Sequence, residues 1–363
     1  MTLNLRVTRS LANAIDSHDN GFNFVRLVCA LLVVVFHAYQ LNTVHPGALD
    51  PVSALVAPVS DLGMMAVGVF FLISGIFITQ SWARDPHALR FALRRVARIV
   101  PGLFACLLIS TVVAVTFYSP SGWHGLLDGA PWRYIFGGSV LHGLVYNIPP
   151  AELRIAGVLA GQDLNGPLWT LYWEGRMYVM VALVGMCAVL PMRTWLRGAA
   201  IFLLLAANLF PTVLSGYIWE VPMWSLFLSG MLLYTLAASV RVGWRHVACA
   251  LVLIALNWTR SQAMTPSGLT FFGLALAMCA LGLWAGTARS TGWAHLRKND
   301  YSYGIYIWHW PVLLMLRSSF PALDALPLLA AGLAVIVPLA MLSWHAIEAP
   351  VLSRTRRLLR HRM

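Results

Sequence analysis

The chain has 363 residues, of which 59% are hydrophobic and 10% are charged, whereas a soluble globular domain carries about 25% charged residues. Apolar runs of roughly 20 residues recur along it, which is the length that a membrane-spanning α-helix needs. This composition excludes a soluble domain and predicts an all-α, polytopic membrane helix bundle. The formal net charge of +12 comes almost entirely from arginines between the apolar runs, a pattern that indicates membrane orientation rather than nucleic-acid binding.

Ten apolar runs are predicted to cross the membrane. They cover residues 22–42, 62–82, 99–118, 168–190, 197–215, 218–239, 245–259, 267–288, 302–319 and 325–346. A further apolar stretch, 132–148, is shorter, rich in glycine and interrupted by Arg133, His142 and Asn147. If this stretch does not cross, most arginines collect on one side of the membrane, as the positive-inside rule requires. We therefore expect about ten transmembrane helices, both termini cytoplasmic, and a re-entrant or interfacial piece within 119–167.

The organisation along the chain is simple. A transmembrane domain, 22–346, is expected between a polar N-terminal segment, 1–21, and a basic cytoplasmic tail, 347–363. All five cysteines fall within or beside apolar runs, without a CxxC spacing. We therefore expect neither a disulfide framework nor a metal site.

The first span carries two polar side chains, Arg26 and His37. They are eleven residues apart, so a helix places both on one face, separated by roughly 16 Å along its axis. Ionisable groups within a membrane helix are costly and indicate a functional site. The structural alternatives are an arginine that extends to the lipid headgroups and a hydrogen-bonded core histidine.

The second span contains small residues, Gly68, Ser74 and Gly75, which we interpret as sites of close helix packing. An arginine cluster follows, in which Arg95 and Arg98 share a helix face. Arginine clusters suit bidentate phosphate binding, although the cluster also fits a topology signal alone.

Three later spans carry further candidate residues. Glu174 lies well inside the fourth span, at a depth comparable with His37, so a carboxylate–imidazole pair is one interpretation and a structural pair with Arg176 is another. The ninth span holds Ser302 and His309 seven residues apart on one face. Glu348, at the cytoplasmic border after the last span, is expected to form a salt bridge with loop arginines.

Taken together, these segments resemble the membrane acyltransferase-3 family, the multispanning O-acyltransferases of surface and secreted carbohydrates. The matching motifs are Arg26 with His37 (R-x10-H), VGVFFLISGIFIT at 67–79, Arg95-x-x-Arg98 followed by IVP, NGPLWTLYWE at 165–174, YSYGIYIWHWP at 301–311 and WHAIEAP at 344–350. They occur in family order over nearly the whole chain. One departure follows Glu174, where the family favours aromatic residues and this chain has Gly175-Arg176-Met177 before Tyr178.

The resemblance implies an acyl-CoA donor, usually acetyl-CoA, and a sugar hydroxyl as the acceptor. It leads us to assign His37 and Glu174 as catalytic, Arg26, Arg95 and Arg98 as donor-binding, and Trp169, Ser302, Tyr303 and His309 as substrate-binding, with no metal. His37 would act as a general base, since an imidazole titrates near neutral pH. An acyl-imidazole intermediate is the alternative, because histidine is also a nucleophile.

The expected protein is thus an O-acyltransferase of the bacterial cytoplasmic membrane, in contact with lipid and with no nucleic-acid partner. A polytopic transporter is the competing class, because a bundle with buried Arg, His and Glu also suits a solute pathway. However, neither an inverted repeat nor a pair of broken helices is evident in the sequence. A cytoplasmic acceptor, such as a macrolide or a lipid-linked sugar, is the alternative within the enzyme class.

Overall fold

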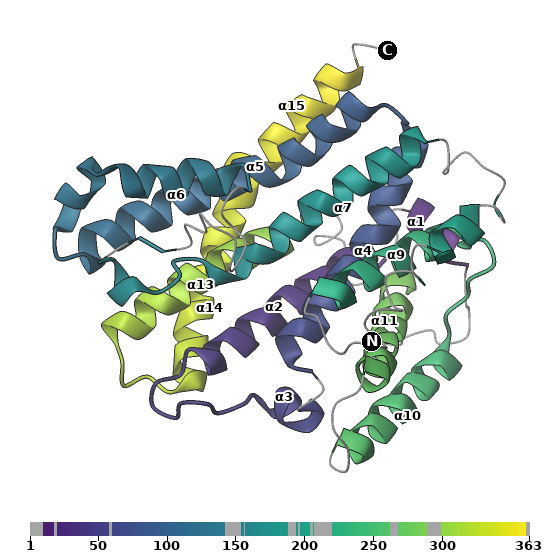
Figure 1. Cartoon of the computed structure of the whole chain (residues 1–363), viewed down its shortest axis with the longest axis horizontal. Helices are drawn as coiled ribbons and strands as arrows, with labels where there is room; N and C mark the ends of the chain where they lie inside the picture. The colour runs from purple at the N-terminus through teal and green to yellow at the C-terminus, as the bar shows by residue number, and fades with distance from the viewer. Residues whose placement is uncertain are drawn as a thin grey trace. The chain divides into compact units, whose positions relative to one another are not determined.

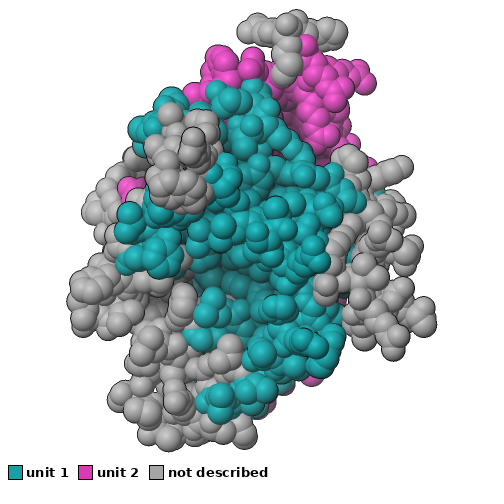
Figure 2. Space-filling model, turned by 90° about the vertical axis from the view of Figure 1, so that its right-hand side faces the viewer, with its two compact units in different colours: residues 1–36, 49–86, 180–300 teal, residues 37–48, 87–179, 301–363 magenta. Residues whose placement is uncertain are grey.

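The computed structural model describes residues 10–17, 20–57, 60–141, 154–155, 157–187, 194, 197–203, 206, 220–261, 268–288 and 299–360. Within these residues every named element is a helix, which confirms the predicted all-α class (Figure 1). The chain divides into two compact units, each built from three segments (Figure 2). Unit 1 comprises Met1–Phe36, Leu49–Pro86 and Met180–Asp300, and unit 2 comprises His37–Ala48, His87–Val179 and Tyr301–Met363.

Four helical runs in the described part of the chain are long and apolar enough to cross a membrane. They are α2 (Phe22–Gln40), α4 (Leu62–Arg84), α5 (Ala88–Tyr118) and the run from α14 (Ala325–Ser343) through η4 (Trp344–Glu348) to α15 (Ala349–Arg360). The predicted spans that begin at residues 22, 62, 99 and 325 are therefore confirmed as long apolar helices.

Most of the other predicted spans also form helices. These are α7 (Trp169–Met186), α9 (Glu220–Thr235), α10 (Trp244–Ser261), α11 (Gly268–Thr287) and α13 (Ser302–Ser319). The predicted span 197–215 is helical at 197–203, and most of its remainder lies outside the described residues. The total of ten spans and the cytoplasmic location of both termini stay predictions.

The apolar stretch 132–148, which we expect not to cross the membrane, overlaps in part with α6 (Gly129–Ser139). This helix has 11 residues, about half the length that a spanning helix needs, so by itself it fits the expected non-crossing piece. The later part of the stretch, with His142 and Asn147, lies outside the described residues. The remaining short elements are α1 (Leu11–Asp16), α3 (Pro51–Val56), η1 (Gly122–Leu127), η2 (Leu159–Gly161) and η3 (Gly166–Leu168).

The arginine cluster lies on a helix, because α5 begins at Ala88, well before the predicted apolar run. The His87 side chain accepts a hydrogen bond from the Arg90 amide, and such a cap satisfies one of the unpaired donors at a helix start. Alanine, leucine and arginine all favour helix, so the segment extends α5 without being apolar. Arg95 and Arg98 consequently occupy fixed positions, one turn apart, before Pro101.

In unit 1, α4 packs closely against α9 through two glycines. A Cβ added at Gly75 would lie 2.1 Å from the Phe227 carbonyl oxygen, and one at Gly230 would lie 2.2 Å from the Leu72 carbonyl oxygen. These backbones can approach only because neither position carries a side chain. The close-packing interpretation of Gly75 is thus confirmed.

Replacing Gly75 with alanine is expected to lower the thermal unfolding midpoint, because the new methyl group must displace the backbone of α9. Overpacking of this kind costs about 1–3 kcal/mol. Thermal unfolding in detergent would measure the effect. Gly129→Ala, in α6, is the matched control, since a Cβ there meets nothing within 4 Å; equal stability of the two variants would contradict the packing argument.

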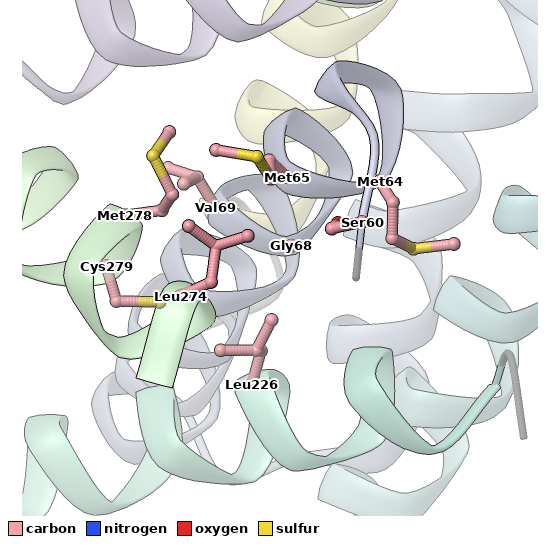
Figure 3. A pocket seen from close by; sticks show the side chains of 9 residues that line it. All are labelled: Ser60, Met64, Met65, Gly68, Val69, Leu226, Leu274, Met278 and Cys279. Atoms are coloured by element: carbon pink, nitrogen blue, oxygen red, sulfur yellow. The ribbon is translucent and has the colours of Figure 1, made fainter. Parts of the chain in front are cut away.

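A small apolar pocket also lies in unit 1, against the side of α4 (Figure 3). Its lining is rich in flexible sulfur-containing side chains, including Met64, Met65 and Met278, and Leu226 of α9 closes one side. Methionine fills irregular gaps well because its side chain is unbranched and flexible. The lining includes none of the residues predicted to carry chemistry, so we treat it as a packing defect.

Unit 2 contains α5, α13, α14 and α15, with α13 packed along α14 and α5 in contact with α13 and α15 (Figure 1). Pro311 lies inside α13 and lacks the amide that would bond the carbonyl four residues earlier, which belongs to Ile307. That carbonyl instead accepts hydrogen bonds from the Asn165 side-chain amide, at 2.9 Å, and from the Cys106 thiol, at 3.2 Å. Because of the proline, the Ile307 carbonyl is available to link α13 by hydrogen bonds to α5 and to the segment before α7.

Candidate active site

The imidazole of His309 is held inside α13 of unit 2, with no exposed surface. Its Nδ1 is hydrogen-bonded to the Tyr306 carbonyl, one turn earlier in the same helix. A carbonyl oxygen can only accept, so Nδ1 of His309 carries a proton. In the neutral ring, Nε2 is then the acceptor.

His37, in the last turn of α2, meets this acceptor directly. Its Nδ1 lies 2.9 Å from Nε2 of His309. The ring centroids are 4.9 Å apart and the ring planes differ by 24°, so the two rings are close to parallel. The Trp310 ring stands at 90° to the His37 ring, with 5.0 Å between centroids. The two histidines thus form a dyad between residues that are 272 positions apart.

The protonation state of the two histidines follows from the complete burial of His309. A charge on a fully buried ring is costly, so His309 is neutral and its Nε2 accepts the Nδ1 proton of His37. In neutral His37 the unprotonated nitrogen is consequently Nε2. Nε2 is therefore the basic nitrogen of that ring.

The segment before α7 and the first turn of α7 form hydrogen bonds with the turn of α13 that carries His309. The Trp310 indole donates to the Asp163 carbonyl at 2.8 Å, and the Tyr306 hydroxyl donates to the Pro167 carbonyl at 2.8 Å. The Thr170 hydroxyl lies 2.6 Å from the Tyr306 hydroxyl. These bonds fix the turn of α13 that carries His309, and the sequence interpretation had missed Tyr306 and Asp163 as contributors.

Hydrogen bonds hold the segment that follows α2, a few residues beyond His37. The Asn42 side-chain amide donates to the Asp324 carboxylate at 2.7 Å, and the Thr43 hydroxyl donates to the Pro321 carbonyl at 3.0 Å. The Ala325 amide, and then the Asn42 side chain, lower the pKa of the Asp324 carboxyl by hydrogen bonding to its charged form. The carboxylate therefore accepts from both the segment after α2 and the start of α14.

Arg98, on α5, forms a buried ion pair with Glu348 at 3.3 Å, in which the Glu348 side chain is 1% exposed. Glu348 also accepts a hydrogen bond from Ser343 at 2.9 Å. The Arg98 guanidinium lies over the Tyr303 ring, 5.3 Å from its centroid. The expected salt bridge between Glu348 and an arginine is confirmed. Glu348 is the last residue of η4, a π-helical turn. Such turns are often found at functional sites.

Arg95 and Glu174 both contact Tyr178. The Arg95 guanidinium is 5.8 Å from the centroid of the Tyr178 ring and 5.7 Å from that of Phe91. The Tyr178 hydroxyl donates a hydrogen bond to the Glu174 carboxylate. Glu174 is thus oriented by a residue of its own helix, and the predicted pair between Glu174 and His37 stays a prediction.

The remaining predicted residues are placed as follows. Arg26 belongs to unit 1, where it forms an ion pair with Asp300 at 2.8 Å. Ser302 is fully buried at the first position of α13, the Tyr303 hydroxyl donates to the Ile99 carbonyl at 2.7 Å, and Trp169 is half-buried at the start of α7. Within the described residues, no three His, Cys, Asp or Glu side chains are grouped as metal ligands.

Known proteins resemble this chain, two of them over most of its length. A family model for an acyltransferase domain matches residues 19–345. Nodulation protein 10 of Rhizobium leguminosarum bv. viciae is 27% identical, over 96% of this chain and 97% of its own. An O-acetyl transferase of Shigella phage Sf6 is 25% identical over 93% of this chain and 97% of its own. The acyltransferase MdmB of Streptomyces mycarofaciens is 30% identical, over 43% of this chain and 36% of its own. No solved structure matches the chain.

Proposed function

Because the chain belongs to the membrane acyltransferase-3 family, whose domain model covers residues 19–345, we propose that it transfers an acetyl group from acetyl-CoA to a hydroxyl of a surface or secreted carbohydrate. The name of the phage relative, an O-acetyl transferase, supports the acetyl group and the oxygen acceptor. The observation that carries the proposal is the dyad of His37 and His309, at 2.9 Å, because a neutral His37 that donates from Nδ1 has Nε2 as its basic nitrogen. The proposed location is the bacterial cytoplasmic membrane.

The donor side of the proposal rests on arginines. Coenzyme A is polyanionic, and a guanidinium binds phosphate through two parallel hydrogen bonds. Arg95 and Arg98 lie one turn apart on α5, close enough to bind neighbouring phosphate groups. Arg26 is a third candidate, and it lies on the same helix as His37, separated from it by roughly 16 Å along the axis.

The proposed reaction uses His37 as a general base. Its Nε2 takes the proton of the acceptor hydroxyl while the hydroxyl oxygen attacks the thioester carbonyl. The carbon–sulfur bond then breaks, and the thiolate of coenzyme A receives the proton from His37, so no charge is left on the enzyme. Glu174 is proposed to balance the charge that His37 carries between these steps. An acetyl-imidazole route, in which Nε2 itself attacks the thioester, uses the same nitrogen.

The purified protein, incubated with radiolabelled acetyl-CoA and a bacterial polysaccharide, tests the proposal. We expect label to move to the polysaccharide and to be released by mild alkali, as an O-ester is. A transporter would leave the label on coenzyme A. Failure to transfer label to any carbohydrate, while a macrolide or lipid-linked sugar accepts it, would contradict the carbohydrate acceptor and retain the enzyme class.

Replacing Arg95 with alanine is expected to raise the KM for acetyl-CoA about 10- to 100-fold and to change kcat little. The physical reason is the loss of a charge-assisted hydrogen bond to phosphate, worth about 1.5–3 kcal/mol. Initial rates at varied acetyl-CoA concentration measure it. Arg90→Ala, on the preceding turns of α5, is the control, and an unchanged KM in Arg95→Ala would remove Arg95 from the phosphate site.

A further inference from the structure

We propose that His309 is a positioning residue, which acts through His37 by fixing the proton on its Nδ1, and does not bind the acceptor. This inference rests on the proposed function of His37 as the base. It replaces the substrate-binding role that the sequence suggested for His309.

The first argument is that His309 has no nitrogen left for a substrate. Nδ1 is hydrogen-bonded to the Tyr306 carbonyl, and Nε2 lies 2.9 Å from Nδ1 of His37. The side chain is also fully buried, so an acceptor sugar has no surface of the ring to contact. An imidazole has only these two polar atoms, and both are used within the protein.

The second argument is that the Tyr306 carbonyl determines which nitrogen donates in the hydrogen bond between His309 and His37. Because it accepts the Nδ1 proton of His309, Nε2 must accept from His37, and His37 must keep its own proton on Nδ1. Without this constraint, an imidazole is free to place its proton on either nitrogen. His309 therefore selects the tautomer of His37 in which Nε2 is basic.

The third argument is that His309 remains useful during the reaction. When His37 has taken the acceptor's proton on Nε2, its ring is positively charged and its Nδ1 proton still points at Nε2 of His309. A hydrogen bond from a charged donor is roughly twice as strong as a neutral one, so the dyad stabilises the charged state more than the neutral state. His309 stays neutral throughout, and no proton has to pass beyond it.

The fourth argument is that the surroundings hold His309 in place. Asn165 bonds the carbonyl that Pro311 leaves without its helical partner, at 2.9 Å. Trp310, next to His309 in the chain, is anchored on the Asp163 carbonyl at 2.8 Å. A site needs its supporting residues within about half an ångström of the productive geometry, and these bonds restrain the turn of α13 on both sides of His309.

Three variants test the proposal. His309→Gln places an amide oxygen near the position of Nε2 and is expected to keep kcat within about tenfold of the wild type, since an acceptor for His37 remains. His309→Phe removes the acceptor and is expected to lower kcat about a hundredfold, the scale of a misplaced catalytic group. The KM for acetyl-CoA should change less than about twofold. His309→Asn, whose amide is too short to reach His37, should resemble His309→Phe and serves if the phenylalanine variant does not fold.

The second readout does not depend on activity. Nitrogen NMR of ¹⁵N-histidine-labelled protein in nanodiscs reports which ring nitrogen carries the proton, and the signal of His37 is identified by its loss in His37→Ala. We expect His37 protonated on Nδ1 in the wild type and in His309→Gln, and a shift toward Nε2 protonation in His309→Phe and His309→Asn.

Two results would overturn the positioning role. One is an unchanged tautomer of His37 in both His309→Phe and His309→Asn. The other is a rise in the KM for the acceptor with unchanged kcat in these variants, which would support a substrate-binding role for His309. An inactive wild type with the expected tautomers would instead count against the proposed function alone.

Discussion

Replacing His37 with alanine is expected to abolish acetyl transfer while the affinity for coenzyme A stays within about twofold of the wild type. The proposed base contributes about 10²- to 10⁴-fold to the rate, and it lies roughly 16 Å along α2 from Arg26, one of the proposed donor-binding residues. Removing it is therefore expected to affect the reacting centre and to leave the proposed phosphate contacts in place. Transfer of label from acetyl-CoA measures the rate, and calorimetric titration with coenzyme A measures the affinity.

A neighbouring histidine supplies the control for this experiment. His45 follows α2 and is 68% exposed, at 3.9 Å from Asp324, so His45→Ala should keep full activity. Full activity of His37→Ala would end its assignment as the base. Rapid mixing of the wild type with acetyl-CoA, without acceptor, then separates the two routes. An acetyl group trapped on His37 would establish the acetyl-imidazole route and exclude pure general-base catalysis.

Helix positions were predictable where apolar runs have sharp polar ends. The span predicted at 302–319 is the helix α13 itself, Ser302–Ser319, because Asp300 precedes it and a loop with Pro321 follows. The apolar run predicted at 99–118 covers only the later part of α5, which begins 11 residues before that run at Ala88, since hydropathy does not detect a helix rich in arginine. Its beginning depends instead on the His87 cap and on helix propensity, both of which are local signals that a search for apolar runs ignores.

The dyad was not predictable in the same way, although both of its histidines were singled out. Sequence indicates how deep a residue lies along its own helix, but not which helices are neighbours. Depth alone suggested Glu174 as a partner of His37, a pair that stays a prediction, and it did not indicate that His309 lies 2.9 Å from His37. One local signal was available: Pro311 inside a helix exposes the Ile307 carbonyl, which required a partner such as Asn165.

Breaking the ion pair between Arg98 and Glu348 is expected to destabilise the protein strongly. Glu348 is 1% exposed and Arg98 is 15% exposed, at 3.3 Å, so either single replacement leaves an uncompensated buried charge. Such a loss costs about 3–5 kcal/mol. We expect Arg98→Met and Glu348→Met each to lower the denaturation midpoint in detergent markedly, and the double variant to recover much of the loss, because two methionines bury no charge.

The exposed pair of Arg84 and Asp16, at 3.0 Å with side chains 61% and 67% exposed, is the matched control. Exposed pairs contribute about 0–1 kcal/mol. The two single methionine variants and the double variant at these positions should therefore have nearly additive effects on stability. Additive losses at Arg98 and Glu348 would contradict a coupled buried pair. Donor kinetics of the two single variants then separate structure from binding: if Arg98 also binds coenzyme A, Arg98→Met raises the KM for acetyl-CoA, whereas Glu348→Met, which keeps the guanidinium, does not.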